Sequence, residues 1–143
     1  HFASDHPPLK ILDVGTGSVI LAMSGAALGS KEVIDCDIDS DACRVAAENV
    51  QQNQLDQIVT ITEQTLDQIS GHYELVLANI LAGENIRLAT QLVERLAPGG
   101  RLVLSWILVE QEQQVLYGFD SFNLNQLSIS HLDEWNCIVY QCL

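Results

Sequence analysis

Short apolar runs alternate with amphipathic stretches along this chain. Runs of strand length occupy residues 10–14, 32–38, 58–62, 73–81 and 101–108. The segments between them predict helices at about 20–28, 40–50, 86–96 and 110–119, where apolar side chains recur at helical spacing. This alternation is typical of an open, doubly wound α/β sheet with helices on both faces.

The ends of the predicted elements carry suitable residues. Gly29 suits a helix C-cap, and either Asp39 or Ser40 suits an N-cap. Pro98-Gly99-Gly100 is expected to stop the third helix. The unbroken apolar character of 73–81 indicates a parallel strand that is buried on both faces.

Two further β-like runs, 127–132 and 135–143, follow the last helix and predict an antiparallel C-terminal hairpin. We therefore expect five βα units and a mostly parallel, seven-stranded sheet. The length of 143 residues suits one domain, covering 1–143.

Charge narrows the range of partners. Six Lys and Arg against 19 Asp and Glu give a net charge of −13. Nucleic acids and anionic membranes bind clustered cations, so we expect neither as a partner. No apolar run reaches the roughly 18 residues needed to span a bilayer, and the first eight residues lack the features of a signal peptide. We therefore expect a cytoplasmic location.

The cysteines do not form a metal-binding pattern. The four are Cys36, Cys43, Cys137 and Cys142. They contain no C-x-x-C pair and no histidine stands at zinc-ligand spacing. We expect reduced thiols and no metal site.

The turn after the first strand is the most informative segment. It reads Asp13-Val14-Gly15-Thr16-Gly17, and glycines at such a turn let the backbone approach a ligand. A dinucleotide fingerprint would need its third glycine at position 20, which is Ile20. A nicotinamide-dependent oxidoreductase is thereby disfavoured. The carboxylate of Asp13 favours a cationic ligand, although it could also only hydrogen-bond the backbone of a tight turn.

Asp37 is a candidate ribose ligand. It lies 22 positions after Gly15, at the end of the second predicted strand, where a carboxylate can accept hydrogen bonds from both ribose hydroxyls. The neighbouring acids, Asp35, Asp39 and Asp41, leave open a second interpretation, in which this is a solvated loop with a helix cap.

Several motifs together resemble one family. These are D-x-G-x-G at 13–17, A-N-I-L-A at 78–82, P-G-G-R-L-V-L-S at 98–105, I-L at 107–108 and D-E-W at 133–135. The set resembles class I S-adenosylmethionine-dependent methyltransferases with a Rossmann-like fold. It is most similar to the PrmA type, which trimethylates amino groups of the large-subunit ribosomal protein eleven. The resemblance covers about residues 9–143 and implies a protein substrate such as a ribosomal protein.

The resemblance also implies a set of site residues. Gly15 and Gly17 would line the methionine end of S-adenosylmethionine, Asp37 would bind the ribose, and Glu63 or Gln64 would lie near the adenine. The full implied cofactor-binding set is Asp13, Gly15, Thr16, Gly17, Asp37, Ile38, Glu63, Gln64 and Asn79.

Asn79 is the implied catalytic residue, beside the sulfonium methyl. Methyl transfer to nitrogen is an in-line displacement that needs a neutral amine aimed at the methyl carbon. An amide carbonyl can accept an N–H of that amine without adding a charge. The alternative is an asparagine that only satisfies backbone groups at a strand end.

Three differences from the family pattern support a second hypothesis. Val19 replaces the third motif glycine, and its β-branched side chain takes a positive φ only at a cost and would project toward the methionine end. Trp106 replaces the glycine before I-L. The family's N-terminal substrate-recognition domain and its G-T-G-x-H segment are expected to be absent. The leading hypothesis is a protein amino-group N-methyltransferase domain, and the alternative is a catalytically impaired cofactor-binding or relic module.

Overall fold

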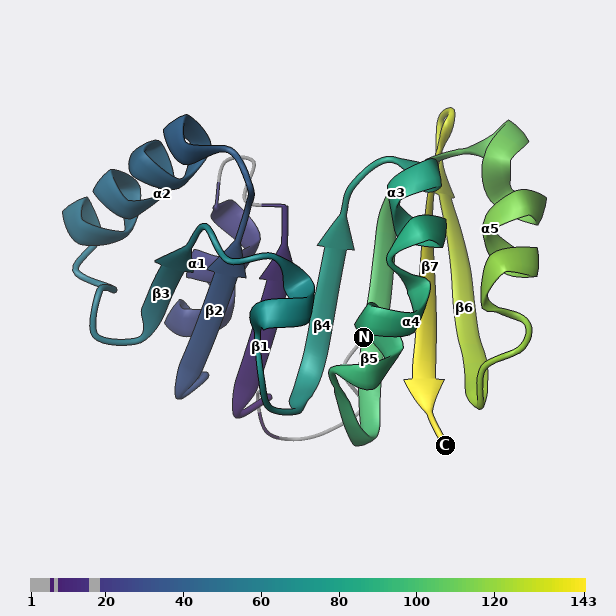
Figure 1. Cartoon of the computed structure of the whole chain (residues 1–143), viewed down its shortest axis with the longest axis horizontal. Coiled ribbons are helices and arrows are strands. Elements are labelled where there is room, and N and C mark those ends of the chain that lie inside the picture. Colours follow the sequence, from purple (N-terminus) through teal and green to yellow (C-terminus); the bar gives the residue numbers. More distant parts are fainter. Residues whose placement is uncertain (1–5, 7, 16–18) are drawn as a thin grey trace.

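The computed structural model describes residues 6, 8–15 and 19–143, and its centre is a seven-stranded sheet (Figure 1). The strand order is β3-β2-β1-β4-β5-β7-β6. The strands are β1 (Lys10–Val14), β2 (Glu32–Cys36), β3 (Val59–Thr62), β4 (Tyr73–Asn79), β5 (Leu96–Leu108), β6 (Leu124–Leu132) and β7 (Trp135–Cys142). Strands β1 to β5 pair in parallel, while β7 runs antiparallel to both β5 and β6. The predicted fold class is confirmed.

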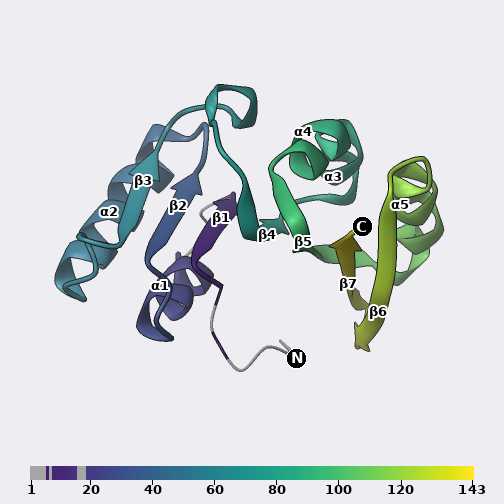
Figure 2. The same cartoon turned by 90° about the horizontal axis from the view of Figure 1, so that it is seen from below.

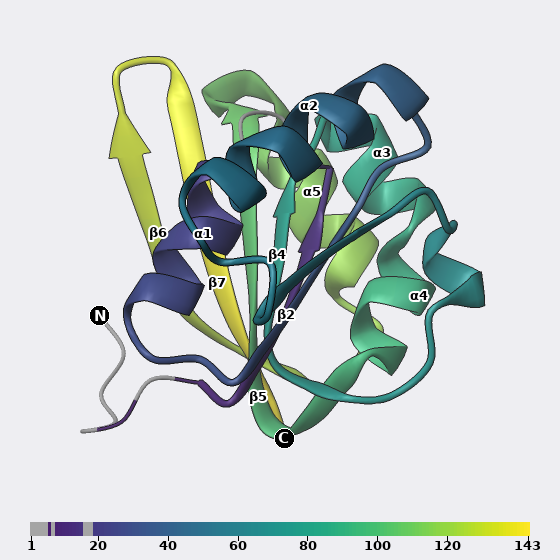
Figure 3. The same cartoon turned by 90° about the vertical axis from the view of Figure 1, so that its left-hand side faces the viewer.

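The helices cover both faces of the sheet. They are α1 (Ile20–Ala27), α2 (Ser40–Gln52), α3 (Ala82–Arg87), α4 (Ala89–Glu94) and α5 (Glu112–Phe119), with 3-10 turns at Leu66–Gln68 and Val109–Gln111. Seen from the side, α1 and α4 lie on opposite sides of the sheet (Figure 3). The cap of α2 is Asp39, whose side chain accepts hydrogen bonds from the backbone of Asp41 and Ala42.

Two expectations about the helices were wrong. In place of the single helix expected at 86–96, the structure has two short helices, α3 and α4, of which the first begins at Ala82. The break between them is at Leu88, whose φ of −93° and ψ of 4° are not helical. The five expected βα units are also too many, since only the 3-10 turn at Leu66–Gln68 connects β3 to β4. Apolar spacing could not reveal the break, because both short helices bury the same stripe.

Two strands have ends that differ from the predicted positions. β5 begins at Leu96, ahead of the Pro98-Gly99-Gly100 segment, because Leu96 already pairs with Tyr73 of β4. β2 ends at Cys36, opposite Thr62, the last residue of β3. Ile38 therefore lies beyond the strand and is exposed.

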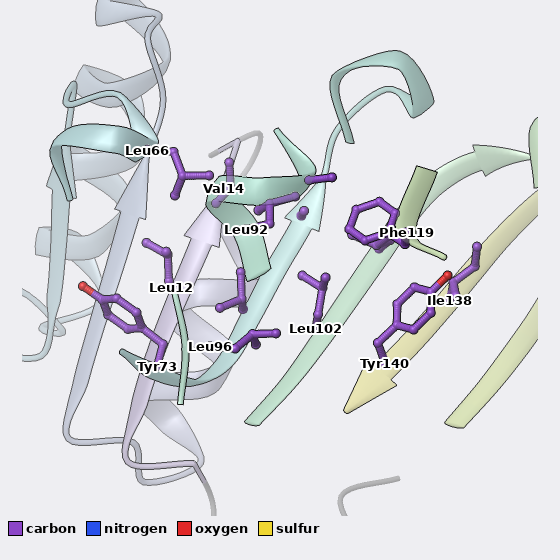
Figure 4. Packing of buried hydrophobic residues seen from close by; sticks show 14 of the residues in the cluster. Leu12, Val14, Leu66, Tyr73, Leu92, Leu96, Leu102, Phe119, Ile138 and Tyr140 are labelled. Carbon is purple, nitrogen blue, oxygen red and sulfur yellow. The ribbon is translucent and has the colours of Figure 1, made fainter. Parts of the chain in front are cut away.

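Alternating strand residues build two cores. On the face covered by α1 and α2, a smaller cluster includes Ile11, Val33 and Leu75. The opposite face is covered by α3, α4 and α5 (Figure 2). Its larger cluster contains Leu12 and Val76 together with residues of these helices, and Leu12 and Phe119 are among those drawn in Figure 4. This period-two segregation is what a sheet buried on both faces requires.

The larger core also joins the C-terminal hairpin to the rest of the domain. Phe119 of α5 stacks on Tyr140 of β7, with ring centroids 5.6 Å apart (Figure 4). Ile138 of β7 is fully buried in the same cluster. Within the described part of the chain, no helix is both long and apolar enough to span a membrane.

The register of the three central strands positions the site. Val14 of β1 pairs with Cys36 of β2 on one side and with Ala78 of β4 on the other. The next residue on each strand is Gly15, Asp37 or Asn79. Three residues that are far apart in the sequence thus follow one row of the sheet, at its carboxyl edge. The chain order reverses here, and this is where open α/β sheets bind ligands.

Candidate functional site

Gly15 makes the turn over the edge of β1. Its φ of 87° is the left-handed conformation that glycine adopts without steric cost, and its N–H donates to the Cys36 carbonyl over 2.8 Å. A Cβ at this position would lie 2.6 Å from Cγ2 of Ile80 and 3.7 Å from the Asn79 carbonyl oxygen. The turn therefore abuts the end of β4 closely, and no larger residue fits without a shift.

A pocket opens at this edge, on the face of the larger core. Its walls come from β1, β2, β4, α3 and the segment after β3. The lining residues are Val14, Gly15, Cys36, Asp37, Ile38, Gln64, Thr65, Leu66, Ile80, Glu84, Arg87 and Leu88. The lining therefore combines apolar walls with one carboxylate at the end of β2 and polar groups at the mouth. A mostly apolar cleft with a few converging polar groups is the usual form of a small-molecule site.

Asp37 is fixed at the rim of this pocket. Its N–H donates to the Thr62 carbonyl over 3.1 Å, and its Oδ1 accepts the N–H of Asp39 over 2.9 Å. The helix cap is Asp39 rather than Asp37. Of the acidic residues near the end of β2, Asp39 therefore has the role of a helix cap, whereas Asp37 lines the pocket.

The other predicted residues fall in different places. Gln64 and Ile38 line the pocket, whereas Glu63 is exposed outside the lining. Thr16 and Gly17 lie outside the described residues. Their assignment, like every role in the predicted set, stays a prediction.

Asp13 points away from the pocket. It is buried on the α1 face, opposite Asp35 of β2, and makes a hydrogen bond with the backbone of Ala22 in α1. Burial raises the pKa of Asp13 well above its usual value, and the neighbouring Asp35 raises it further. This position supports a structural role for Asp13, in which its carboxyl stabilises the start of α1. Asp13 is not among the residues that line the pocket.

Asn79 ends β4 beside Gly15 and is half-buried. Its Oδ1 accepts a hydrogen bond from the hydroxyl of Ser105 on β5 over 2.9 Å. Asn79 is not part of the pocket lining, but the next residue, Ile80, is. The amide is therefore held against β5, at the carboxyl end of the sheet.

The two residues that depart from the family pattern both adopt positive φ. Val19 has φ 60° and Trp106 has φ 63°. The expectation that Val19 projects toward a ligand was wrong: its side chain is buried in the smaller core with Ile11 and Ala22. An apolar side chain gains more from that core than from the open turn. Trp106 is half-exposed and packs edge-on against Trp135, with ring centroids 6.1 Å apart.

Sequence reasoning missed an ion pair at the pocket mouth. Arg87 Nη2 lies 2.6 Å from Glu84 Oε2, and both side chains line the pocket. The bond from Arg87 lowers the pKa of the Glu84 carboxyl. The i, i+3 spacing in the helix after β4 was the signal that could have revealed it.

The strand order, the antiparallel β7 and the pocket at the carboxyl edge define the class as a Rossmann-like methyltransferase fold. Among solved structures, the ribosomal protein L11 methylase from Lactobacillus delbrueckii subsp. bulgaricus superposes with a TM-score of 0.91 at 26% identity, covering 99% of this chain and 73% of that chain. A SAM-dependent O-methyltransferase from Thermotoga maritima shares the fold, with a TM-score of 0.81 at 15% identity over 96% of this chain and 60% of that one.

The chain belongs to the ribosomal protein L11 methyltransferase (PrmA) family, whose profile matches residues 3–142. The ribosomal protein L11 methyltransferase of Syntrophotalea carbinolica is 50% identical over 133 residues, which are 93% of this chain and 43% of that protein. The protein of the same name from Geotalea uraniireducens is 45% identical over 134 residues, 94% of this chain and 42% of that protein.

The chain spans less than half the length of these relatives. The family match agrees with the resemblance read from the motifs. It does not favour the alternative of an impaired or relic module.

Proposed function

We propose that this chain is the catalytic part of an S-adenosylmethionine-dependent protein N-methyltransferase that acts on amino groups of a ribosomal protein. The single observation that carries the proposal is the row formed by Gly15, Asp37 and Asn79 at the carboxyl edge of the sheet. This row supports the proposal because a turn glycine, a carboxylate and a neutral amide follow neighbouring strands at one edge of the sheet, in a chain of this family.

The residues present fit such a cofactor. Gly15 adopts φ 87° and lines the pocket with its backbone, which a residue with a Cβ could not do without a clash against Ile80. Asp37 lines the pocket at the end of β2, where a carboxylate binds ribose hydroxyls. Ile38 and Leu66 supply apolar walls for an adenine ring. When bound, the cofactor supplies an electrophilic methyl group on a sulfonium.

The chain's own part in methyl transfer is to position the amine. In this proposal the Asn79 amide accepts an N–H of the neutral acceptor and orients its lone pair. This raises the rate by proximity and alignment rather than by adding charge. The net charge of −13 attracts both a cationic cofactor and a basic protein substrate at low salt. We expect the protein to act in the cytoplasm, where ribosomal proteins are found.

The first test is calorimetric titration with S-adenosylhomocysteine, alongside a thermal-shift scan. A ligand at 100 times its dissociation constant stabilises a protein by about 2.7 kcal/mol. We expect saturable binding at one site and a matching rise in Tm. Absence of binding would contradict the cofactor assignment.

The second test measures transfer of labelled methyl groups from S-adenosylmethionine to purified ribosomal proteins. We expect label on amino groups of one ribosomal protein. A chain that binds the cofactor analogue but labels no ribosomal protein would contradict the acceptor assignment and leave the cofactor assignment intact.

A further inference from the structure

We propose that Ser105 is a positioning residue of the methyl-transfer site, acting by holding the Asn79 amide in place for the acceptor amine. The inference rests on the proposed function. It adds a residue on a different strand, β5, which neither the pocket lining nor the implied cofactor-binding set contains.

The first step is the geometry of the pair. Ser105 and Asn79 are register partners on the parallel strands β5 and β4. The Ser105 hydroxyl donates to Asn79 Oδ1 over 2.9 Å, and both side chains are half-buried. A hydroxyl has a single donor, which this bond uses. The carbonyl oxygen of an amide has two lone pairs, so Oδ1 can also accept one N–H from an amine.

The second step is the irregularity of β5 at this point. Leu104 pairs with Ile138 of β7, and Ile107 pairs with Asn136. Two residues, Ser105 and Trp106, therefore stand opposite the single residue Cys137, which is a β-bulge. Bulges occur beside active sites, where they re-aim a side chain.

The backbone strain lies in the same bulge. Trp106 has a φ of 63°, a conformation that a non-glycine residue adopts at a cost. Residues held in such sparsely populated conformations cluster at active sites. Here such a residue stands next to the one residue of β5 that presents a hydroxyl to Asn79.

The third step is the chemistry. An asparagine side chain at a strand end can rotate about two bonds, and only a narrow range of its orientations aims Oδ1 at an acceptor. A hydrogen bond from a rigid neighbouring strand removes that freedom before the acceptor binds. Catalytic groups are most effective when their supporting residues lock them in this way.

Threonine and valine at position 105 make a matched pair of variants. Ser105→Thr keeps the hydroxyl, while Ser105→Val has nearly the same shape and lacks it. With S-adenosylmethionine and the methyl-accepting ribosomal protein, we expect Ser105→Val to lower kcat about 10- to 100-fold, as small misplacements of reacting groups do. We expect Ser105→Thr to stay within a few-fold of wild type.

Two further readouts separate positioning from a structural role. The dissociation constant for S-adenosylhomocysteine should be equal in the two variants, because Ser105 lies outside the pocket lining. The Tm of Ser105→Val should be only a few degrees lower, since one hydrogen bond is lost. Asn79→Ala should lower kcat, and adding Ser105→Val to it should cause little further loss.

Each outcome has a distinct meaning. Equal kcat for Ser105→Val and Ser105→Thr, or additive effects with Asn79→Ala, would overturn the role of Ser105 and leave the proposed function standing. A wild-type protein that binds S-adenosylhomocysteine but methylates no ribosomal protein would overturn the proposed function and this inference with it.

Discussion

Asp13 and Asp35 stand opposite each other on β1 and β2, and both carboxyls are buried on the same face of the sheet. Burial raises the pKa of Asp35 to about 7, and the nearby Asp37 contributes to the rise. Among the described residues, Oδ1 of Asp13 and both side-chain oxygens of Asp35 have no hydrogen-bond partner. The pair therefore favours protonated carboxyls, and this makes the stability of the fold depend on pH.

Asp35→Asn should make the domain more stable above pH 7. The folded pKa of Asp35 lies above the unfolded value of 3.8, so its contribution to stability is complete below about pH 4 and is lost as pH rises toward 7. Three pKa units correspond to at most about 4 kcal/mol, so we expect a gain of about 2 to 4 kcal/mol at pH 8 and little change at pH 4. Urea unfolding at several pH values measures this.

The exposed Asp56→Asn is the control for Asp35→Asn, because it removes the same charge without affecting the pair. It should change stability little at either pH. Parallel stability-versus-pH curves for wild type and Asp35→Asn would contradict the prediction.

Gly15→Ala should destabilise the domain and weaken cofactor binding. The added Cβ would lie 2.6 Å from Ile80 Cγ2, and alanine at φ 87° costs about 1 to 2 kcal/mol before any clash. The turn and the end of β4 would have to separate. A lower Tm and a larger dissociation constant for S-adenosylhomocysteine would show this.

Gly83→Ala is the matched control for Gly15→Ala. Gly83 lies in α3, and a Cβ there would have no neighbour within 4 Å. Since alanine favours helices over glycine, this variant should be as stable as wild type or up to about 1 kcal/mol more stable. If the two alanine variants behaved alike, close packing at Gly15 would not be the cause.

Trp106→Gly should be more stable than Trp106→Ala, although at most positions a glycine variant is less stable than the alanine variant. Both variants lose the edge-on contact with Trp135, but only glycine adopts φ 63° without cost. We expect a difference of about 1 kcal/mol in the free energy of unfolding. Chemical denaturation of the two variants measures it directly, and a more stable alanine variant would show that position 106 relaxes out of the left-handed region.

Asp37→Ala should weaken the binding of S-adenosylhomocysteine by about 1 to 3 kcal/mol, which is the cost of leaving ribose hydroxyls without their partner. The Tm of the ligand-free variant should change little, because Asp39 and not Asp37 caps α2. The rise in Tm that S-adenosylhomocysteine causes should be clearly smaller in the variant than in the wild-type protein. Calorimetry provides the measurement, with Asp56→Ala as a surface control. An unchanged dissociation constant would remove Asp37 from the site.

The sequence predicted those parts of the fold that depend on local pattern. β1 was expected at 10–14 and is found there, because a compact apolar run is followed at once by a turn glycine. Gly15 and Asp37 were expected in one site from their spacing of 22 positions and from the resemblance, and the residues before them, Val14 and Cys36, are register partners.

What depends on pairing between distant segments could not be predicted. The bond between Ser105 and Asn79 joins residues 26 positions apart and leaves no local pattern. Likewise, the sequence places Asp35 in a strand and Asp39 at a helix cap, but the complete burial of Asp35 depends on β1 and α1, which come from other parts of the chain. Val19 was misplaced because the core that receives it is built mostly from other elements.

The outer position of β6 in the sheet affects self-association. This strand is nine residues long, is mostly exposed, and contains no Lys, Arg, Asp or Glu. Bare edge strands are templates for the addition of strands from other molecules, and proteins usually protect them with charges placed on the edge itself. In this domain the protection comes instead from the net charge of the whole chain, because two copies that each carry a charge of −13 repel one another. Because salt screens that repulsion, this domain should be prone to edge-to-edge aggregation at high ionic strength.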